Sequence, residues 1–507
     1  MRISFHGTGR LGLNKRGSSP ILARFAVFIV KEYDFIVLGT GSAMEIVNVL
    51  IEDNPSVRAA IIDKDEPGGI CLTRGCIPSK ILLYSAELVR TIERAKEFGI
   101  STDIKNVDFQ KVMQRMRTLI DEEINNLRQG LFHSKNLDYY NSVAQFVAPY
   151  TLKVGNETIT SKMIFLCCGS KPIIPAIAGL ESVPYLTSDT ILKLDRLPKS
   201  IAIIGGGYIA AEYGHFLSAM GSKVTIIGRN PQFIPEEEPE VSALAKRELQ
   251  KHMTVITNHE VRRVENASAG RRRVIAVDRE TGKEAEILTD EILVASGRGP
   301  NSDILRPERA GIKTDEKGWI IVNEYLETSQ PNVWAFGDAD GKYLFKHVAN
   351  YEALLVYFNA VQKKGVKVDY HAVPHAIFTY PEIALVGLKE KEAIEKYGQE
   401  NVLIGFHRYE DTAKGEAMGV RDYFVKVILE KDTLKIIGAH IIGPSASVLI
   451  QEIVNVMYTD EQTAEPLIKA MHIHPALSEV VARAFSPLMT PQLYHHTIEE
   501  HYGLSIK

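Results

Sequence analysis

The 507-residue sequence predicts an α/β protein with two Rossmann-like dinucleotide-binding domains and a C-terminal α+β domain. Two stretches carry this prediction, because each sets an apolar strand, a glycine-rich turn and a helix in direct succession. The first covers residues 35–52 and the second covers residues 201–212. A mixed pattern of strands and helices after residue 374 predicts the third domain.

The first nucleotide unit has an apolar strand at 35–38, a glycine turn and a helix to about residue 52. A second apolar strand ends in Asp63, which is placed to bind ribose hydroxyls while the helix N-terminus faces a diphosphate. Met44 stands where such a turn normally has its third glycine, so a long side chain must pack between helix and strand. The candidate nucleotide-binding residues of this unit are Gly39, Gly41, Ser42 and Asp63.

A cysteine pair follows in the sequence GGICLTRGCIPSK at residues 68–80. Cys71 and Cys76 precede an amphipathic segment, so they can meet as a disulfide at the first turn of a helix. A helix N-terminus lowers a thiol pKa, and so short a loop forms and breaks its disulfide readily. The alternative is two unrelated core cysteines.

The whole chain has four cysteines, which argues against a disulfide scaffold and for a reducing compartment, the cytoplasm. A disulfide there would be catalytic. We interpret the neighbouring Cys167 and Cys168 as buried packing at the end of a strand, and we predict no metal site.

The composition excludes two classes of partner. Hydrophobic residues make up 45% and charged residues 24% of the chain, as in ordinary globular proteins. The net charge of -4, without blocks of like charge, provides no basic surface for nucleic acid. No apolar run approaches the length of a membrane span, so we predict no membrane partner.

The first thirty residues contain basic residues but no acid, and their apolar run at 21–30 is broken by Arg24. A secretory signal would need a small-residue cleavage site, and none precedes Lys31. We therefore expect residues 1–30 to be a loose extension, or the product of a start codon placed too far upstream.

The cysteine stretch resembles the redox motif GG-x-C-x-x-x-GC-x-P-[ST]-K of the flavin-dependent pyridine-nucleotide disulfide oxidoreductases. This family includes dihydrolipoyl dehydrogenase and the glutathione, mycothione and mercuric reductases. Further family motifs are matched at 295–301 (ASGRGPN), 328–338 (TSQPNVWAFGD) and 474–479 (HPALSE). The resemblance covers almost the whole chain.

The resemblance implies a division of the chain into four parts after the extension. These are a first FAD-binding part at 31–187, an NAD(P)-binding domain at 188–293, a second FAD-binding part at 294–371 and a dimerisation domain at 372–507.

The resemblance also implies FAD in the first unit, with Asp338 hydrogen-bonded to the ribityl chain. Lys80 and Glu212 correspond to an ion pair beside the flavin, and Tyr208 to the aromatic residue that covers the nicotinamide pocket. Gly297 is expected against the nicotinamide nucleotide. The remaining cofactor-binding residues implied are Gly69 and Gly337 for FAD and Gly205 and Gly207 for the nicotinamide nucleotide.

The residues at the end of the second strand of the second unit indicate which nicotinamide cofactor, NADH or NADPH, is bound. NAD-dependent members place an acid there, whereas this chain has Gly228 followed by Arg229. Arginine can pair with a 2′-phosphate, so NADPH is favoured over NADH. NADPH-dependent relatives often carry a second base six positions further on, where this chain has Pro235.

The catalytic residues implied are Cys71, Cys76, His474 and Glu479. Cys76 would exchange electrons with the flavin, and Cys71 would attack the substrate disulfide. His474 of the partner subunit, held by Glu479, would act as the acid/base. The expected assembly is therefore a homodimer with shared sites, and we interpret His472 as structural.

Within the family the sequence is most similar to mycothione reductase. Four segments carry this similarity, at 39–42, 346–350, 411–418 and 473–481. Because substrate pockets diverge freely, the substrate is a small-molecule disulfide or a lipoyl domain, with dihydrolipoyl dehydrogenase as the alternative. Mercuric and thioredoxin reductases are disfavoured because no cysteine follows Cys168. A non-catalytic flavoprotein subunit would be expected to lose the catalytic residues, and all four are present.

Overall fold

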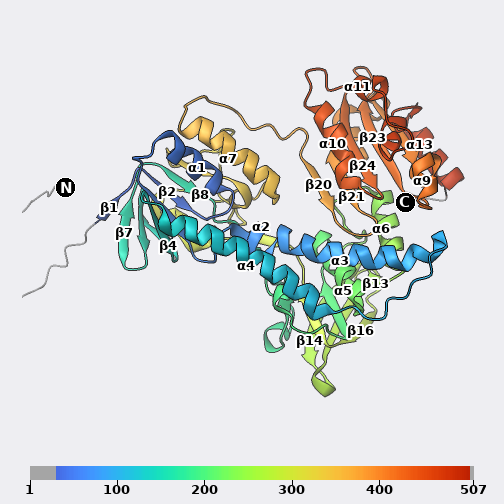
Figure 1. The fold of residues 1–507 in the computed structure, drawn as a ribbon, viewed down its shortest axis with the longest axis horizontal. Helices are drawn as coiled ribbons and strands as arrows, with labels where there is room; N and C mark the ends of the chain where they lie inside the picture. The colour runs from blue at the N-terminus through green and yellow to red at the C-terminus, as the bar shows by residue number, and fades with distance from the viewer. Residues whose placement is uncertain (1–29, 503–507) are drawn as a thin grey trace, which may run out of the picture.

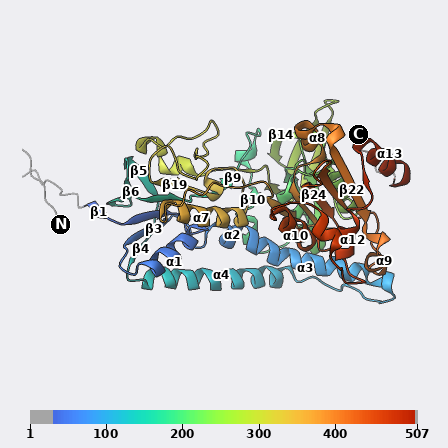
Figure 2. The same cartoon turned by 90° about the horizontal axis from the view of Figure 1, so that it is seen from above.

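The computed structural model describes residues 30–502, with side chains described to residue 500, so the extension predicted at 1–30 lies almost wholly outside the described part. Figure 1 shows three packed regions, with the first nucleotide unit at one end and the second unit and the C-terminal domain at the other. Helices α3 (Cys76–Arg94) and α4 (Phe109–His133) run along one side of the molecule (Figure 2).

The first unit is a five-stranded parallel sheet of order β19-β8-β2-β3-β4. Phe35 and Val37 of β2 face helices α1 and α7, whereas Ile36 and Leu38 face a second, smaller sheet. This alternation follows from the period of two in a strand, and it buries both faces of the sheet. The elements are β2 (Phe35–Leu38), α1 (Ala43–Asp53), β3 (Ala59–Asp63), β4 (Leu137–Asn141), β8 (Ile164–Leu166), β19 (Val333–Ala335) and α7 (Lys346–Ala360).

The smaller sheet has the order β1-β7-β6-β5. The sequence pattern predicts one strand at 151–159, but this segment forms a hairpin, because Gly155 adopts a positive φ of 56° and turns the chain. The sequence pattern also predicts one strand at 141–146, but the structure divides this segment between the end of β4 at Asn141 and the start of β5 at Ala144. The strands are β1 (Val30–Glu32), β5 (Ala144–Ala148), β6 (Thr151–Val154) and β7 (Glu157–Thr160).

The second unit is a parallel sheet of order β10-β17-β11-β12-β13, covered on one face by an antiparallel sheet of order β14-β15-β16. Its helix α5 packs against α3, so the two units share a core. The elements are β10 (Leu186–Thr187), β11 (Ser200–Ile204), α5 (Tyr208–Met220), β12 (Lys223–Ile227), α6 (Pro239–Leu249), β13 (Thr254–Ile256), β14 (His259–Asn266), β15 (Arg272–Asp278), β16 (Glu284–Thr289) and β17 (Glu291–Val294).

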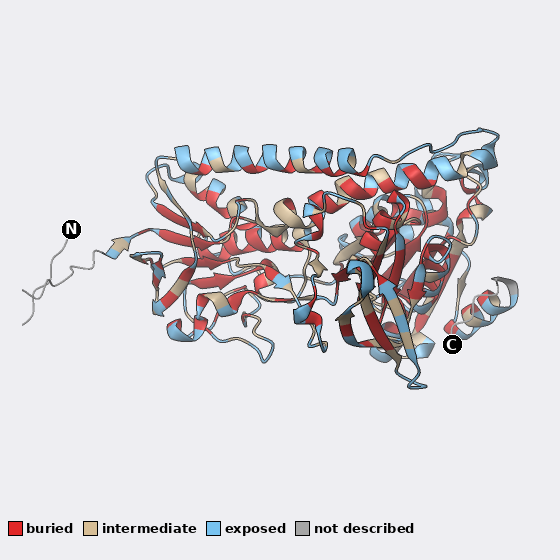
Figure 3. Cartoon of the chain, turned by 90° about the horizontal axis from the view of Figure 1, so that it is seen from below, coloured by how far each residue is buried: buried red, intermediate tan, exposed pale blue. Residues whose placement is uncertain are grey.

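The chain enters and leaves the second unit along one antiparallel strand pair, β9 (Ser170–Pro172) and β18 (Arg298–Pro300). Helix α4 buries Met116, Ile120 and Ile124, which follow one another at a spacing of four residues, and its outer face is exposed to solvent (Figure 3). Among residues 30–502, no helix is both long and apolar enough to cross a membrane.

The C-terminal domain is a six-stranded antiparallel sheet of order β20-β21-β24-β23-β22-β25, with α10 packed on it. The strands are β20 (Pro374–Ile377), β21 (Ile383–Gly387), β22 (Val402–Arg408), β23 (Phe424–Glu430), β24 (Ile436–Ile442) and β25 (Leu488–Met489). The helices are α8 (Glu390–Tyr397), α9 (Ala413–Ala417), α10 (Ala446–Met457), α11 (Glu465–Lys469), α12 (Ser478–Arg483) and α13 (Pro491–Tyr502).

A buried lysine joins this domain to the second nucleotide unit. Lys426 of β23 is fully buried, and its Nζ lies 2.6 Å from Glu240, 2.7 Å from Glu390 and 3.2 Å from Glu238. Burial alone would lower the pKa of Lys426, but the three carboxylates raise it above its usual value. These carboxylates lie close enough together to bind a metal ion, and the lysine ammonium supplies the cation between them.

Candidate active site

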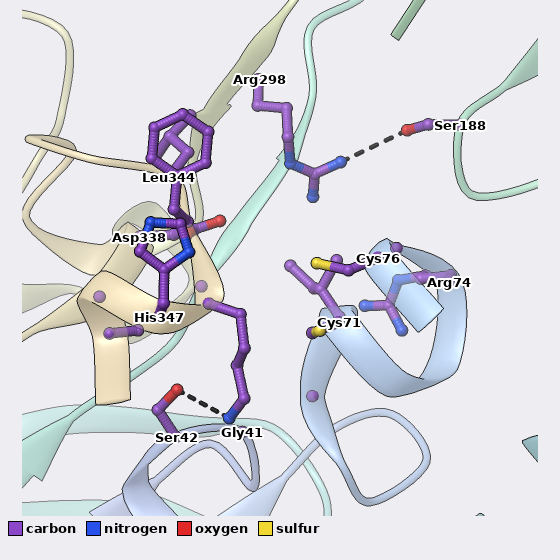
Figure 4. Close-up of a pocket in the computed structure, with 18 of the residues that line it drawn as sticks. Gly41, Ser42, Cys71, Arg74, Cys76, Ser188, Arg298, Asp338, Leu344 and His347 are labelled. Atoms are coloured by element: carbon purple, nitrogen blue, oxygen red, sulfur yellow. Dashed lines mark hydrogen bonds between the residues drawn. The ribbon is translucent and has the colours of Figure 1, made fainter. Parts of the chain in front are cut away.

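A cavity of about 750 Å³ lies where the two nucleotide units and the C-terminal domain meet. Figure 4 shows Cys71 and Cys76 across this cavity from the segment that carries Asp338 and His347. Twelve of the predicted site residues line it together: Gly39, Gly41, Ser42, Asp63, Gly69, Cys71, Cys76, Lys80, Tyr208, Glu212, Gly337 and Asp338.

Both glycine turns approach the backbone of a neighbouring strand end. Gly39 has a φ of 113°, and a Cβ built on it would lie 2.2 Å from the carbonyl oxygen of Cys167. Gly205 repeats this arrangement in the second unit, with a φ of 136° and a distance of 2.1 Å to the carbonyl oxygen of Ala295. Only glycine fits at either position, as expected for the first glycine of a dinucleotide turn.

The cysteine stretch packs directly on the first glycine turn. Gly69 has a φ of 67°, and a Cβ there would lie 2.6 Å from the Cα of Gly41. This contact fixes the cysteine pair at the rim of the nucleotide site. The contact also explains why the cysteine stretch opens with two glycines, since Gly68 likewise has a positive φ of 112°.

The lower part of the cavity suits the diphosphate of a dinucleotide. The N-terminus of α1 opens there, and Lys346 Nζ donates a hydrogen bond to Ser42 Oγ over 2.9 Å (Figure 4). A helix N-terminus and an ammonium group at one point favour an anion. A role for Lys346 was not predicted from the sequence, although this residue lies in the segment 346–350 that is similar to mycothione reductase.

Two predicted acids line the same cavity. Asp63 accepts hydrogen bonds from the backbone N of Thr40 over 2.9 Å and from its hydroxyl over 2.6 Å. Asp338 accepts one from the Ser170 hydroxyl, which itself accepts one from Arg298 Nε over 2.7 Å. Burial raises the pKa of both carboxyl groups above the usual range.

The two cysteines lie at a break between helices. Cys71 is in α2 (Gly69–Arg74), and Cys76 is the first residue of the 19-residue helix α3. Gly75 separates them in a conformation in which a Cβ would lie 2.8 Å from the carbonyl oxygen of Ile70. Both cysteines are free thiols in the structure, and both face the cavity.

The thiol pair shares its proton unequally. Hydrogen bonding from the Cys71 thiol lowers the pKa of Cys76 to about 7, despite burial, and the nearby charge of Lys80 acts in the same direction. The same hydrogen bond and burial raise the pKa of Cys71. In the reduced pair Cys76 therefore carries the thiolate, and Cys71 keeps the proton until a base removes it.

An ion pair from two domains borders the cysteines. Lys80 Nζ lies 2.9 Å from both carboxylate oxygens of Glu212, and the backbone N of Phe378 donates to the same carboxylate over 3.0 Å. Lys80 also lies 4.8 Å from the centre of the Phe378 ring. Burial raises the pKa of the neighbouring Tyr208 to about 12, so this phenol stays neutral.

The predicted residues for the nicotinamide nucleotide lie partly apart from this cavity. Gly205, Gly207, Gly297 and Arg229 are not among its lining residues. Gly297 has a φ of 111° in the connection between β17 and β18, and Arg229 is exposed at the end of β12. These four residues follow the ends of β11, β12 and β17, so they lie along one edge of the second sheet, the nucleotide edge of the second unit.

His474 and Glu479 also lie outside the cavity of their own chain. His474 Nδ1 lies 3.1 Å from a carboxylate oxygen of Glu479, and Arg483 donates to the same oxygen over 3.0 Å. The hydrogen bond from His474 lowers the pKa of Glu479. The His474 side chain is 65% exposed, so the held imidazole faces outward. His472, interpreted as structural, contacts the carbonyl oxygen of Ala470.

Exposed apolar side chains lie next to this histidine along the chain. Met471 is 100% exposed and Ile473 is 78% exposed. Single exposed apolar residues are ordinary, but a group of them beside a held histidine indicates an interaction surface.

Cys167 and Cys168 follow β8 and are half-buried between the apolar cores and the cavity. Burial raises the pKa of Cys168 to about 12 and raises that of Cys167 as well. These thiols therefore stay protonated at neutral pH, which sets them apart from Cys76.

Similar proteins are known over nearly the full length of the chain. Mycothione reductase of Mycobacterium tuberculosis is 35% identical over 466 residues, which cover 90% of this chain and 99% of that protein. Dihydrolipoyl dehydrogenase of Chlamydia pneumoniae is 33% identical over 464 residues, covering 90% and 96%. The solved HOCl-induced flavoprotein disulfide reductase RclA of Escherichia coli, a Cu(II) complex, has a TM-score of 0.80 at 26% identity, covering 90% and 99%.

The sequence also matches the family described as pyridine nucleotide-disulphide oxidoreductase over residues 33–353. The dimerisation domain of that family matches residues 373–485. These matches and the fold confirm the predicted family, the fold class and the cofactor class. The chain therefore belongs to the pyridine nucleotide-disulphide oxidoreductases, a family of FAD-binding, NAD(P)H-dependent disulfide reductases that carry a C-terminal dimerisation domain.

Proposed function

We propose that this protein reduces a small-molecule disulfide with NADPH in the manner of mycothione reductase. The observation that carries the proposal is the cysteine pair, in which Cys76 favours the thiolate beside the FAD cavity while Cys71 retains its proton. The identity of 35% to mycothione reductase supports this substrate class. The four cysteines of the chain support a reducing compartment, the cytoplasm, in which a disulfide is catalytic.

Gly39, Gly41, Ser42, Asp63 and Asp338 would hold FAD, which would supply the hydride chemistry that couples the nicotinamide to two-electron reduction of the Cys71–Cys76 disulfide. The resulting Cys76 thiolate is stabilised by the Cys71 thiol and by Lys80. Loss of the Cys71 proton generates the nucleophile that attacks one sulfur of the substrate disulfide. This step forms a mixed disulfide with Cys71 and releases the first substrate thiolate.

We assign His474 of the partner subunit to the proton transfers. It takes the proton from Cys71 and donates it to the leaving substrate thiolate, with Glu479 holding the imidazole. Cys76 then attacks Cys71, which releases the second thiolate and restores the Cys71–Cys76 disulfide. The exposed apolar side chains next to His474 and the family's dimerisation domain support a homodimer with shared sites.

Dihydrolipoyl dehydrogenase is the alternative function, since a member from Chlamydia pneumoniae is 33% identical. Gly228 and Arg229 stand at the position where an NAD-type acid is expected, which favours the NADPH-dependent reductase.

The test is anaerobic reduction with NADPH or NADH, followed by reoxidation with mycothiol disulfide, glutathione disulfide, lipoamide and a lipoyl domain. We expect faster reduction by NADPH and fastest reoxidation by mycothiol disulfide. NADH-driven turnover confined to lipoamide or the lipoyl domain would establish the alternative.

A further inference from the structure

A second arginine lies beside Arg229 at the end of β12. Arg279, in the turn between β15 and β16, donates from its Nη1 to the backbone carbonyl oxygen of Arg229 over 3.0 Å. Backbone hydrogen bonds fix this turn against the strand end, from Asn258 N to Asn230 O over 2.8 Å and from Arg279 N to Asn258 O over 2.9 Å. Arg229 and Arg279 are fifty positions apart in the sequence but lie together at one point of the surface.

Both guanidinium groups keep donors for a ligand. Among the described residues, Arg279 makes only the side-chain hydrogen bond to Arg229, and the Arg229 side chain makes no hydrogen bond or ion pair. A guanidinium has five N–H donors. In the part of the chain that the structure describes, the adjacent Asp278 forms no ion pair with Arg279; its carboxylate accepts from the backbone N of Glu280 and Thr281 over 2.8 and 2.9 Å and lies 3.9 Å from His259 Nε2.

The nucleotide edge of the second unit ends at the same place. A Cβ on Gly206, in the glycine turn, would lie 3.1 Å from the Cα of Gly228, so the turn and the end of β12 are in close contact. In a Rossmann unit the ribose of the adenosine half lies over this strand end. A 2′-phosphate on that ribose would lie near the backbone of Arg229, against which the Arg279 guanidinium rests.

We propose that Arg279 is a second specificity-determining residue for the 2′-phosphate of NADPH and supplies the base that is missing at Pro235. This inference rests on the NADPH preference proposed above. Arg229 and Arg279 would bind the phosphate from two sides, each with a charge-assisted hydrogen bond. The turn between β15 and β16 would then provide the second arginine that binds the 2′-phosphate, in place of a second base in the loop after β12.

The test compares Arg279→Ala, Arg279→Lys, Arg229→Ala and the double alanine variant. The matched control is Lys283→Ala, which removes one positive charge from the same exposed hairpin turn. Two quantities are measured at low and high salt: kcat/KM for NADPH and NADH, and the affinity of the FAD-loaded protein for 2′,5′-ADP and for 5′-ADP by calorimetry.

We expect Arg279→Ala to lower kcat/KM for NADPH and the affinity for 2′,5′-ADP by about tenfold, the loss of one such hydrogen bond. Values for NADH and 5′-ADP should stay within about twofold. Arg279→Lys should recover part of the loss, the effect should shrink at high salt, and Lys283→Ala should match the native protein.

Unchanged affinity of Arg279→Ala for 2′,5′-ADP would overturn this inference, whichever nicotinamide the native protein prefers. An equal loss for NADPH and NADH would also overturn it, because it would mean that Arg279 only supports the fold. Equal use of NADPH and NADH by the native protein would instead refute the proposed cofactor preference, so the two failures are distinguishable.

Discussion

Replacing Lys426 with methionine should strongly destabilise the contact between the second nucleotide unit and the C-terminal domain. The substitution keeps the length of the side chain but removes a fully buried ammonium from between three carboxylates. The ligand oxygens of Glu238, Glu240 and Glu390 all lie within 4.8 Å of one another. Without the lysine, the imidazoles of His495, 2.6 Å from Glu390, and His440, 3.6 Å from Glu238, would be the remaining basic groups beside them among the described residues.

The size of the effect follows from this geometry. At an effective dielectric constant of about 20, two unit charges about 4.8 Å apart repel by roughly 3.5 kcal/mol. Proton uptake by one or two of the carboxylates limits the total. We therefore expect the free energy of unfolding to fall by about 3 to 5 kcal/mol, the usual loss when one partner of a buried ion pair is removed.

The loss should depend on pH. In the native protein burial opposes ionisation of Glu240, but Lys426 brings its pKa below the usual value, so this stabilisation is lost only as pH falls through that lowered pKa. The Lys426 contribution is lost only as pH rises through its raised pKa. In the variant, burial without the lysine raises the carboxylate pKa values, so the folded state takes up protons. The destabilisation should therefore be smaller at pH 5 than at pH 8.

The free energy of unfolding is measured by urea unfolding followed by circular dichroism. The concentrations of subunit and of FAD are kept the same in all samples, because subunit association and FAD binding both stabilise the folded state by mass action. Lys251→Met is the control, since Lys251 is 59% exposed and pairs with Glu248 at the surface. It should cost less than about 1 kcal/mol. A Lys426→Met variant within about 1 kcal/mol of the native protein at pH 8 would refute the reasoning.

Three further predictions concern the active site. Cys71→Ser should accept hydride from NADPH but turn over no disulfide, because the attacking thiol is gone; undiminished turnover would contradict its assignment. His474→Ala should slow reoxidation by the disulfide about 10²- to 10⁴-fold while flavin reduction keeps its rate; stopped-flow traces in which the reductive half is slowed instead would mean that His474 has another role. In the reduced protein, alkylation of Cys76 should have its midpoint near pH 7, and Cys71→Ala should move that midpoint upward because the hydrogen bond is lost; an unmoved midpoint would show that the Cys71 thiol does not stabilise the thiolate.

Local patterns in the sequence predicted most of the fold. Each βαβ unit is a run of neighbouring residues, so the strands before Gly39 and Gly205 and the acid at Asp63 could be located from their spacing. The cysteine stretch and the His474–Glu479 pair are equally local. The sequence pattern did not separate the two strands of the hairpin at 151–159, although Gly155 and Asn156 mark the point where the chain reverses.

Contacts between distant segments could not be predicted in this way. A lysine in a strand ordinarily faces solvent, and only the packed domains bring Lys426 to Glu240, 186 residues away in the sequence. Lys346 and Ser42 are 304 residues apart, and Arg279 reaches β12 from a different hairpin. No single-sequence pattern encodes which side chains of separate elements meet.

The most direct test of the account is a thiol count during anaerobic titration with NADPH. The oxidised protein is titrated, alkylated and mapped by mass spectrometry, with Cys76→Ser as the comparison. We predict that NADPH exposes two new thiols, on Cys71 and Cys76, and that the native protein accepts two more electrons per subunit than the variant, since a disulfide is a two-electron couple. Reduction of the flavin without new thiols, or new thiols on Cys167 and Cys168 instead, would contradict it.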